Sequence, residues 1–199
     1  YDEIWTFDRK DYLEHKSELK FRPLFYCERV LPESNGDSNP QYDLAFIGTG
    51  HEDRISIIKA IDKQCKENNL SFFYYIYVPH IFIFFYNKLF NKYYKHVKRS
   101  DVHFQLMPLD EVYRIYANSN CILDVESSTQ TGLTMRTIEI VGIKKKLMTT
   151  NNDITNYDFY SSNNFLVFDR QHGTISKEFF SNTYMEMPND IYEKYSLRS

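Results

Sequence analysis

The chain has 199 residues, of which 42% are hydrophobic and 26% are charged. These proportions allow a packed core and exclude wholesale disorder, and the length corresponds to one large domain or to one domain with a fragment of another. The 24 basic and 27 acidic residues give a net charge of −3, which argues against a general nucleic-acid-binding protein.

Residues 1–31 predict a short strand at "DEIWTF", a helix that begins near Asp8, and an extended segment at "FRPLFY". Pro, Ser, Asn and Gly gather in residues 32–41, which predicts a linker. We therefore expect residues 1–31 to be the tail of a preceding domain with the crossing between domains, and residues 42–199 to form the next domain. Because the chain begins with Tyr1 rather than Met, we also expect it to be a piece of a longer protein.

From residue 42 onward, predicted strands and helices alternate. The apolar run "YDLAFIG" predicts a strand, and Ile55, Ile58 and Ile61 form an apolar stripe at helical spacing in the segment that follows, residues 51–69. Further strands are predicted at "SFFYYIYVP", "VHFQLM", "CILDV", "KKLMTT" and "NFLVF", and further helices from Phe82 to Lys98 and at "LDEVYRIYANS". This alternation predicts the α/β class, with a Rossmann-like parallel sheet and helices on both of its faces.

The stretch "ESSTQTGLTMRTIE" follows one of these strands, and in parallel sheets ligands bind beyond the carboxyl ends of the strands. A helix that begins near Gly132 or Leu133 would direct free N–H groups and the positive end of its dipole at a phosphate. Glu139 lies on the polar stripe of that helix with Arg136, where an acid can accept hydrogen bonds from the two hydroxyls of a ribose. A structural alternative stands beside this: Ser and Thr cap the helix, and Arg136 pairs with Glu139.

The stretch "FIGTGHEDR" is a weaker candidate for the same chemistry. Gly48 and Gly50 form a two-glycine turn after a strand, and Arg54 in the first helical turn stands where a phosphate-binding guanidinium would be useful. The third glycine of a dinucleotide-binding fingerprint and the lysine of a P-loop are both missing. Taken alone, this stretch favours a tight turn and a solvated arginine.

One segment is basic and aromatic, because no Asp or Glu occurs from Ser71 to Ser100. If residues 82–99 are helical, four cations lie on one face of the helix, where they would contact an anionic lipid surface. A sheet-covering helix with a solvated lysine face has the same pattern and is the commoner arrangement. These cations are Lys88, Lys92, Lys95 and Arg99.

The remaining reactive residue types show no catalytic or metal-binding pattern. The three cysteines, Cys27, Cys65 and Cys121, are widely spaced and match the reduced thiols of a cytoplasmic protein. No run of about 18 apolar residues predicts a transmembrane helix. We therefore expect a cytoplasmic protein with no metal site, in which contact with the inner face of the plasma membrane would be peripheral.

Several stretches together resemble a known family. "TFD..D", "RPLFY", "FIGTG..DR", "GLTMRTIEIVGIKKKLMTTN" and "I.NYDFY...N.LVFDR" are similar to bacterial capsule and lipopolysaccharide biosynthesis glycosyltransferases of the two-domain GT-B class. The resemblance is to the C-terminal, donor-binding half of these enzymes and covers most of the chain from about Tyr42 onward. The pieces "GLTMRT.E" and "YDFY" are specific, whereas the "GTG" turn is not.

The resemblance implies a nucleotide-diphosphate sugar as the donor substrate and no tightly bound cofactor. By analogy, Glu139 would hold the ribose, and the backbone near Met107 and Pro108 would meet the base. Gly48, Gly50 and Arg54 would face the donor from the first loop. The diphosphate would lie in a cradle formed by Thr131, Gly132, Leu133 and Thr134, next to Arg136.

We therefore expect the donor-binding half of a glycosyltransferase that transfers a sugar to a surface polysaccharide or to a lipid-linked acceptor. The paired glutamates that retaining members often carry are absent, so the stereochemical outcome stays open and no catalytic residue is assigned. The chain alone is expected to be inactive without the N-terminal half. The alternative is a nucleotide- or sugar-phosphate-binding module without transfer activity, or a subunit that needs a partner chain.

Overall fold

The computed structural model describes residues 3–28, 31, 40–50 and 53–198. The chain divides into two compact units. Unit 1 comprises Tyr1–Val30, Asp124–Phe168 and Asn182–Ser199, and unit 2 comprises Leu31–Leu123 and Asp169–Ser181. Most of the predicted linker lies outside the described residues, and the predicted domain boundaries stay a prediction.

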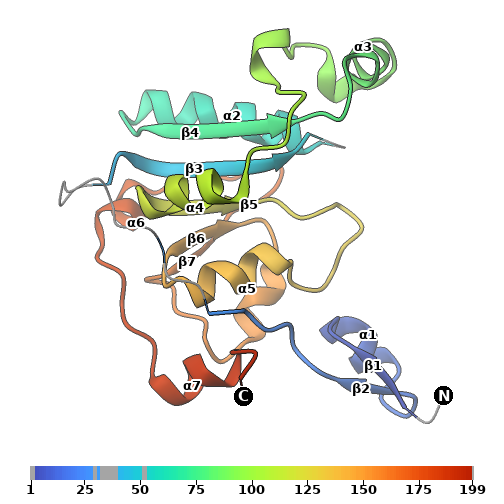
Figure 1. The fold of residues 1–199 in the computed structure, drawn as a ribbon, viewed down its shortest axis with the longest axis vertical. Coiled ribbons are helices and arrows are strands. Elements are labelled where there is room, and N and C mark those ends of the chain that lie inside the picture. Colours follow the sequence, from blue (N-terminus) through green and yellow to red (C-terminus); the bar gives the residue numbers. More distant parts are fainter. Residues whose placement is uncertain (1–2, 29–30, 32–39, 51–52, 199) are drawn as a thin grey trace. The chain divides into compact units, whose positions relative to one another are not determined.

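A five-stranded sheet has the strand order β4-β3-β5-β6-β7 (Figure 1). The pairings of β3 with β4, β3 with β5, and β6 with β7 are parallel; Leu44 in β3, for example, lies opposite Phe72 in β4 and Cys121 in β5. The predicted α/β class with a parallel sheet and flanking helices is therefore confirmed. The strands are β3 (Tyr42–Thr49), β4 (Phe72–Tyr77), β5 (Ser119–Asp124), β6 (Lys146–Thr149) and β7 (Phe165–Val167).

In unit 2, helix α2 (Arg54–Glu67) follows β3, and α4 (Leu109–Ala117) precedes β5. Ile55, Ile58 and Ile61 on α2 have no solvent-exposed surface, so the apolar stripe predicted from their spacing is confirmed. Pro108 stands immediately before α4, where its missing N–H costs no helical hydrogen bond. A further short helix of unit 2 is α6 (Lys177–Ser181).

The long helix predicted from Phe82 to Lys98 is wrong. Helix α3 ends at Phe90 (Ile81–Phe90) and is followed by two short 3₁₀ helices, η1 (Lys92–Tyr94) and η2 (Arg99–Asp101). Asn91 breaks the helix: its backbone is extended, and its side chain accepts a hydrogen bond from the Tyr93 N–H at 2.9 Å. The turn allows the phenol of Tyr94 to donate a hydrogen bond to the carbonyl of Gly50. This buried contact is not predicted by any short-range sequence pattern.

The strand predicted at "VHFQLM" is also wrong. Only His103 forms a β-bridge, with Tyr77 at the end of β4. The segment then leaves the sheet: Leu106 is 70% exposed, and the carbonyl of Gln105 accepts a hydrogen bond from the Tyr75 phenol at 2.7 Å instead of a strand N–H. Beyond His103 the segment has no neighbouring strand to pair with, and alternation alone does not make a strand.

Unit 1 includes a small parallel pair of strands, β1 (Ile4–Thr6) and β2 (Leu19–Phe21), joined through helix α1 (Arg9–Glu14). As predicted, α1 begins at Asp8, whose side chain accepts hydrogen bonds from the first N–H groups of the helix. The other helices of unit 1 are α5 (Met135–Gly142), the 3₁₀ helix η3 (Asn152–Asn156) and α7 (Asn189–Lys194).

Helix α5 begins two to three residues later than the sequence predicted. Thr134 is its N-cap: the backbone there is extended, and the side-chain oxygen accepts a hydrogen bond from the Thr137 N–H at 3.1 Å. Gly132 and Leu133 are therefore part of the loop that leads into the helix. Among the described residues, no helix combines the length and the apolar character needed to cross a membrane.

Candidate functional site

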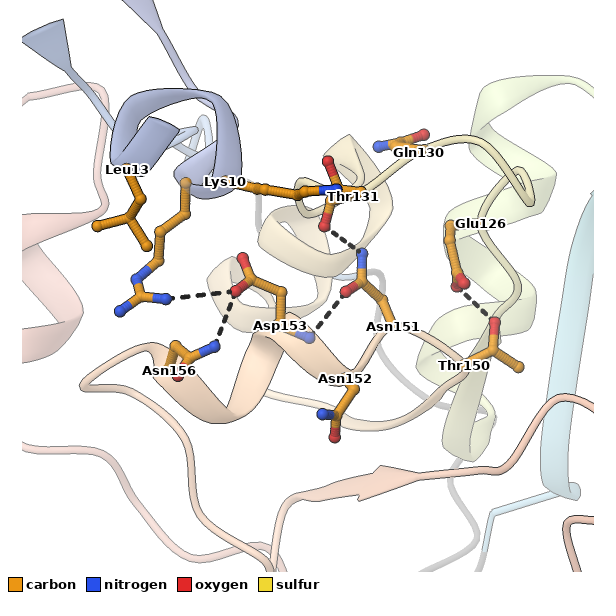
Figure 2. Close-up of a pocket in the computed structure, with 11 residues that line it drawn as sticks. Lys10, Leu13, Glu126, Gln130, Thr131, Thr150, Asn151, Asn152, Asp153 and Asn156 are labelled. Atoms are coloured by element: carbon orange, nitrogen blue, oxygen red, sulfur yellow. Dashed lines mark hydrogen bonds and ion pairs between the residues drawn. The ribbon is translucent and has the colours of Figure 1, made fainter. Parts of the chain in front are cut away.

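A pocket of about 460 Å³ opens in unit 1, where β5 and β6 end. Figure 2 shows that three segments meet around it: helix α1, the loop between β5 and α5, and the residues that follow β6. This is the place where parallel sheets bind ligands. The lining residues are Arg9, Lys10, Leu13, Glu126, Gln130, Thr131, Thr150, Asn151, Asn152, Asp153 and Asn156.

Two cations from α1 reach this pocket. The guanidinium of Arg9 lies 3.7 Å from Oδ1 of Asp153, which also accepts a hydrogen bond from the Asn156 side chain at 2.8 Å. The side chain of Lys10 is 62% exposed, and its ammonium is only loosely paired with Glu14, at 3.9 Å. Arg9 is thus held in position by the pocket wall, while Lys10 keeps an ammonium that can bind an anion.

The second carboxylate oxygen of Asp153 is the unusual polar atom of the site. Oδ2 is buried, and no described residue donates a hydrogen bond to it. An unsatisfied buried acceptor costs free energy. It becomes available to a ligand hydroxyl only when the Asp153 side chain turns toward the pocket.

Asn151 joins the two polar sides of the pocket. Its side-chain amide is almost completely buried and donates to the carbonyl of Gly132 at 3.0 Å, while its oxygen accepts from the Asp153 N–H at 2.9 Å. Glu126 accepts a hydrogen bond from the Thr150 hydroxyl in the same way. The lining is therefore preorganised, which favours a specific polar ligand over non-specific binding.

The predicted phosphate cradle is occupied by a carboxylate of the same chain. Oδ2 of Asp8 accepts hydrogen bonds from the Gly132 N–H at 2.7 Å and from the Thr131 hydroxyl at 2.5 Å, while its Oδ1 caps α1. Burial alone would raise the pKa of Asp8, but the hydrogen bonds from Thr131 and from the N–H groups of Lys10, Asp11 and Gly132 lower it below its usual 3.8. This stretch can therefore bind an anion, and a ligand phosphate must displace Asp8 or lie beside it.

Replacing Asp8 with Ala should lower the free energy of unfolding by about 1–2 kcal/mol at neutral pH, because a helix cap and two contacts with the loop are lost. Since the pKa of Asp8 is lowered in the folded state, its contribution is complete above the unfolded value near 3.8 and is lost as the pH falls through the folded value. Denaturant titrations in neutral and strongly acidic buffer measure both effects. Asp11→Ala, on the same helix and without a described side-chain bond, is the control; an equal loss from it would contradict the assignment.

The start of α5 faces a second internal carboxylate. Asp124 is 2% exposed and accepts hydrogen bonds from the hydroxyls of Thr134 and Thr137, the latter at 2.9 Å, and it pairs with Arg136 at 3.4 Å. Two of the residues predicted to bind the donor are thus engaged with Asp124. Glu139 is half-buried on α5 and is not among the residues that line the pocket.

Of the predicted diphosphate cradle, the structure brings only Thr131 into the pocket wall. Gly132 lies directly behind it, and Leu133 is 2% exposed and belongs to the core. Nothing in the geometry assigns a ligand to Thr134, Arg136 or Glu139, and their donor-binding roles stay predictions.

The predicted site residues of unit 2 have structural contacts of their own. A Cβ on Gly50 would lie 2.5 Å from Ile76, so the close approach of β4 requires a glycine there. The guanidinium of Arg54 donates to the carbonyl and the hydroxyl of Thr49, both at 3.1 Å. Gly48 pairs with Ile76 inside the sheet, and Met107 and Pro108 precede α4. The roles predicted for these residues towards a donor stay predictions.

Unit 2 also brings together two residues of the sequence motifs. Asp53, from "FIGTG..DR", and Arg170, from "LVFDR", form a bidentate ion pair. Nε of Arg170 lies 2.9 Å from Oδ2 of Asp53, and Nη2 lies 2.7 Å from Oδ1. The hydrogen bond from Arg170 lowers the pKa of the Asp53 carboxyl. This pair ties the start of α2 to the segment after β7.

Sequence reasoning missed Asp8, Arg9, Lys10 and Asp153 as site residues. The pattern "TFD..D" carried part of the signal, but only the folded chain brings α1 to the loop before α5, 123 residues away. Within the described residues, no group of three or more His, Cys, Asp or Glu side chains is arranged to hold a metal ion.

Comparisons with known proteins give no family for this chain. No protein-family model matches, and no curated protein matches either. Among solved structures, a GtfA/B complex superposes with a TM-score of 0.46 at 13% sequence identity, over 98% of this chain and 37% of that one. A Listeria monocytogenes protein assigned as a UDP-N-acetylglucosamine 2-epimerase superposes with a TM-score of 0.34 at 9% identity, over 80% of this chain and 40% of that one. The chain spans less than half the length of either, and similarities this distant assign no activity.

Proposed function

We propose that the pocket of unit 1 binds the sugar-phosphate part of a nucleotide-diphosphate sugar, and that the chain is the donor-binding part of a glycosyltransferase of the GT-B class. The observation that carries the proposal is the composition of the pocket wall. Two cations, the buried amide of Asn151 and one unsatisfied carboxylate oxygen meet where two parallel strands end.

The cations suit the phosphates. A volume of about 460 Å³ accommodates a hexose phosphate or part of a nucleotide sugar. Lys10 would bind one phosphate directly, and Arg9, positioned by Asp153, would offer its remaining guanidinium donors to the other. As the glycosidic bond breaks, negative charge grows on the leaving diphosphate, and cations fixed in advance stabilise that charge.

The acidic and amide groups suit the sugar. Oδ2 of Asp153 would accept a hydrogen bond from a sugar hydroxyl once the side chain turns toward the pocket, and the exposed amide of Asn152 can both donate and accept. An anion without hydroxyl groups would leave Oδ2 unsatisfied and would be repelled by it. The pocket therefore favours a ligand with both a phosphate and a polyol part.

The donor roles predicted for the loop and for α5 complete the proposal. Thr131, Gly132 and Thr134 would hold the diphosphate once Asp8 moves aside, and Glu139 would hold the ribose. The acceptor would be a growing surface polysaccharide or a lipid-linked sugar, bound by a part of the protein that this chain does not contain. The chain alone is then expected to bind the donor without transferring it.

The test is calorimetric titration of the chain with UDP, GDP, CMP and their sugar conjugates. One nucleotide family should bind saturably, and its sugar conjugate should bind more tightly than the free nucleotide. Lys10→Ala should weaken that binding about tenfold because a charge-assisted hydrogen bond is lost. Lys16→Ala, an exposed lysine of the same unit outside the pocket, should leave it unchanged.

Two further variants locate the phosphates. If they displace Asp8, Asp8→Asn should tighten binding, and Glu139→Ala should abolish the preference for ribonucleotides. Equal binding by the wild type, Lys10→Ala and Glu139→Ala would contradict the assignment of the site. Sugar transfer after the chain is joined to an N-terminal half would separate the enzyme from a non-catalytic binding module.

A further inference from the structure

Helix α3 of unit 2 exposes an unusually large apolar surface. Of its ten residues, IFIFFYNKLF, only Phe84 is buried among the described residues. The exposed side chains recur three, four, seven and eight residues apart, so they form one stripe along the helix. This apolar stripe consists of Phe82, Phe85, Tyr86, Leu89 and Phe90, with exposed fractions of 75, 53, 63, 78 and 73%.

The opposite side of α3 is firmly attached to unit 2. Phe84 packs edge-to-face against Tyr94 and Phe104, with ring centroids 6.3 Å apart in both cases. Lys88 donates to the carbonyls of Lys95 and Val97 at 2.8 and 2.6 Å. The apolar stripe is therefore a fixed part of a folded surface at the end of β4 (Figure 1), and the segment after the helix is bound directly beside it.

That segment is strongly basic. It carries four exposed cations, and no acidic residue occurs between Ser71 and Ser100. The first acid beyond it, Asp101, is already paired with Lys59 at 3.0 Å. The cations of this basic segment are Lys92, Lys95, Lys98 and Arg99.

We propose that the apolar stripe and the basic segment together form a docking surface for an anionic lipid bilayer. The stripe would insert below the headgroups, and the cations would contact the lipid phosphates beside it. A helix of ten residues is about 15 Å long, which is too short to cross a bilayer but sufficient to lie in its interface. Four of the five stripe residues are Phe or Leu, which are typical of the apolar face of helices that lie in the membrane interface.

Charge selects the bilayer over a second copy of the chain. Two copies that docked stripe to stripe would bring two basic segments together without an acid between them, and like charges at an interface oppose binding. An anionic membrane offers acyl chains for the apolar stripe and negatively charged headgroups for the basic segment in the same surface. The arrangement differs from the cationic helix face predicted from the sequence, because the helix inserts its apolar residues and the cations follow in the turns after it.

The test is co-sedimentation of the full chain with vesicles of phosphatidylcholine alone and of equal parts of phosphatidylcholine and phosphatidylglycerol. The wild type should bind the mixed vesicles and bind the neutral ones much less. Leu89→Ser and Phe82→Ser should each weaken binding about tenfold. Leu106→Ser, which changes a similarly exposed leucine of unit 2, is the matched control and should bind as the wild type does.

Charge is tested separately. Lys92→Gln, Lys95→Gln and Lys98→Gln should each weaken binding to the mixed vesicles about fivefold, whereas Lys63→Gln on α2 should not. Phe85→Trp in a Trp5→Phe background should show a blue-shifted emission on adding mixed vesicles. The proposal is overturned by an absence of vesicle binding, by binding that the stripe variants leave unchanged, or by a concentration-dependent dimer that Leu89→Ser dissociates. Nucleotide binding is measured without vesicles, so it stands or fails independently.

Discussion

Replacing Asp124 with Ala should lower the free energy of unfolding by about 3 kcal/mol, because the change leaves a half-buried cation and two hydroxyls without their carboxylate. Asp124 ends β5 and is 2% exposed. It accepts from the hydroxyls of Thr134 and Thr137 at the start of α5, and it pairs with Arg136, whose side chain is 22% exposed. Chemical denaturation, with hydrogen exchange along α5 as a local probe, measures the loss.

The isosteric change Asp124→Asn separates charge from shape. It keeps the volume but turns two oxygen acceptors into one, so we expect most of the loss to persist. In an Arg136→Met background the loss should shrink, since no cation then loses its carboxylate. Glu193→Ala, an exposed acid of unit 1, should change the stability by less than about 0.5 kcal/mol. A loss at Asp124 no larger than this would show that the cluster does not hold α5 to β5.

The same cluster explains why the sequence predicted the helix but misplaced its start. Apolar residues at helical spacing identified α5, yet several Ser and Thr residues in the preceding loop could each cap a helix. Thr134 became the cap because Asp124, ten residues earlier, holds its hydroxyl at the end of β5. That choice depends on a tertiary contact, and the spacing of residues does not encode it.

The misplaced elements of unit 2 have a similar cause. Apolar periodicity was sufficient for α2, where Ile55, Ile58 and Ile61 are all buried. Beyond α3 apolar or aromatic residues still recur at helical spacing, at Tyr93, Tyr94 and Val97, so the pattern predicted a helix without showing where it ends. The helix ends at Asn91, whose side chain accepts a hydrogen bond from the Tyr93 N–H, and the contact of Tyr94 with the carbonyl of Gly50 holds the turn that follows.

The sequence predicted where the candidate site lies but not all of the residues that form it. A parallel sheet puts ligand sites at the carboxyl ends of its strands, and the loop that contains Thr131 lies there. The cations of the pocket come from α1, at the other end of the sequence. Short-range patterns show Arg9 and Lys10 only as charged residues of a short exposed helix. Their role follows from Asp8, which fastens α1 to the loop through Gly132.

Gly142→Ala should destabilise the protein by about 2 kcal/mol, although alanine is the better helix former. Gly142 is the last residue of α5, and alanine would add a Cβ only 2.5 Å from Cγ of Tyr26 and 2.6 Å from its Cδ2. Tyr26 cannot easily retreat: it is 1% exposed, its phenol donates to the carbonyl of Tyr192 at 2.9 Å, and the Tyr192 phenol donates to the carbonyl of Gly142 at 2.7 Å. Overpacking of this kind costs about 1–3 kcal/mol or more, which exceeds the gain in helix propensity of about 1 kcal/mol.

A double-mutant cycle tests whether the ring of Tyr26 causes this loss of stability. Tyr26→Ala alone should cost about 3–5 kcal/mol, because it empties a buried site. In that background Gly142→Ala should cost clearly less, since the ring atoms are gone and only the Cβ of residue 26, 2.8 Å from the added methyl group, remains for it to meet. If Gly142→Ala destabilised both backgrounds equally, the glycine would be needed for its backbone and not for the ring. The "RPLFY" stretch is then explained by packing: its tyrosine fills the space that the glycine of "EIVG" leaves open at the end of α5.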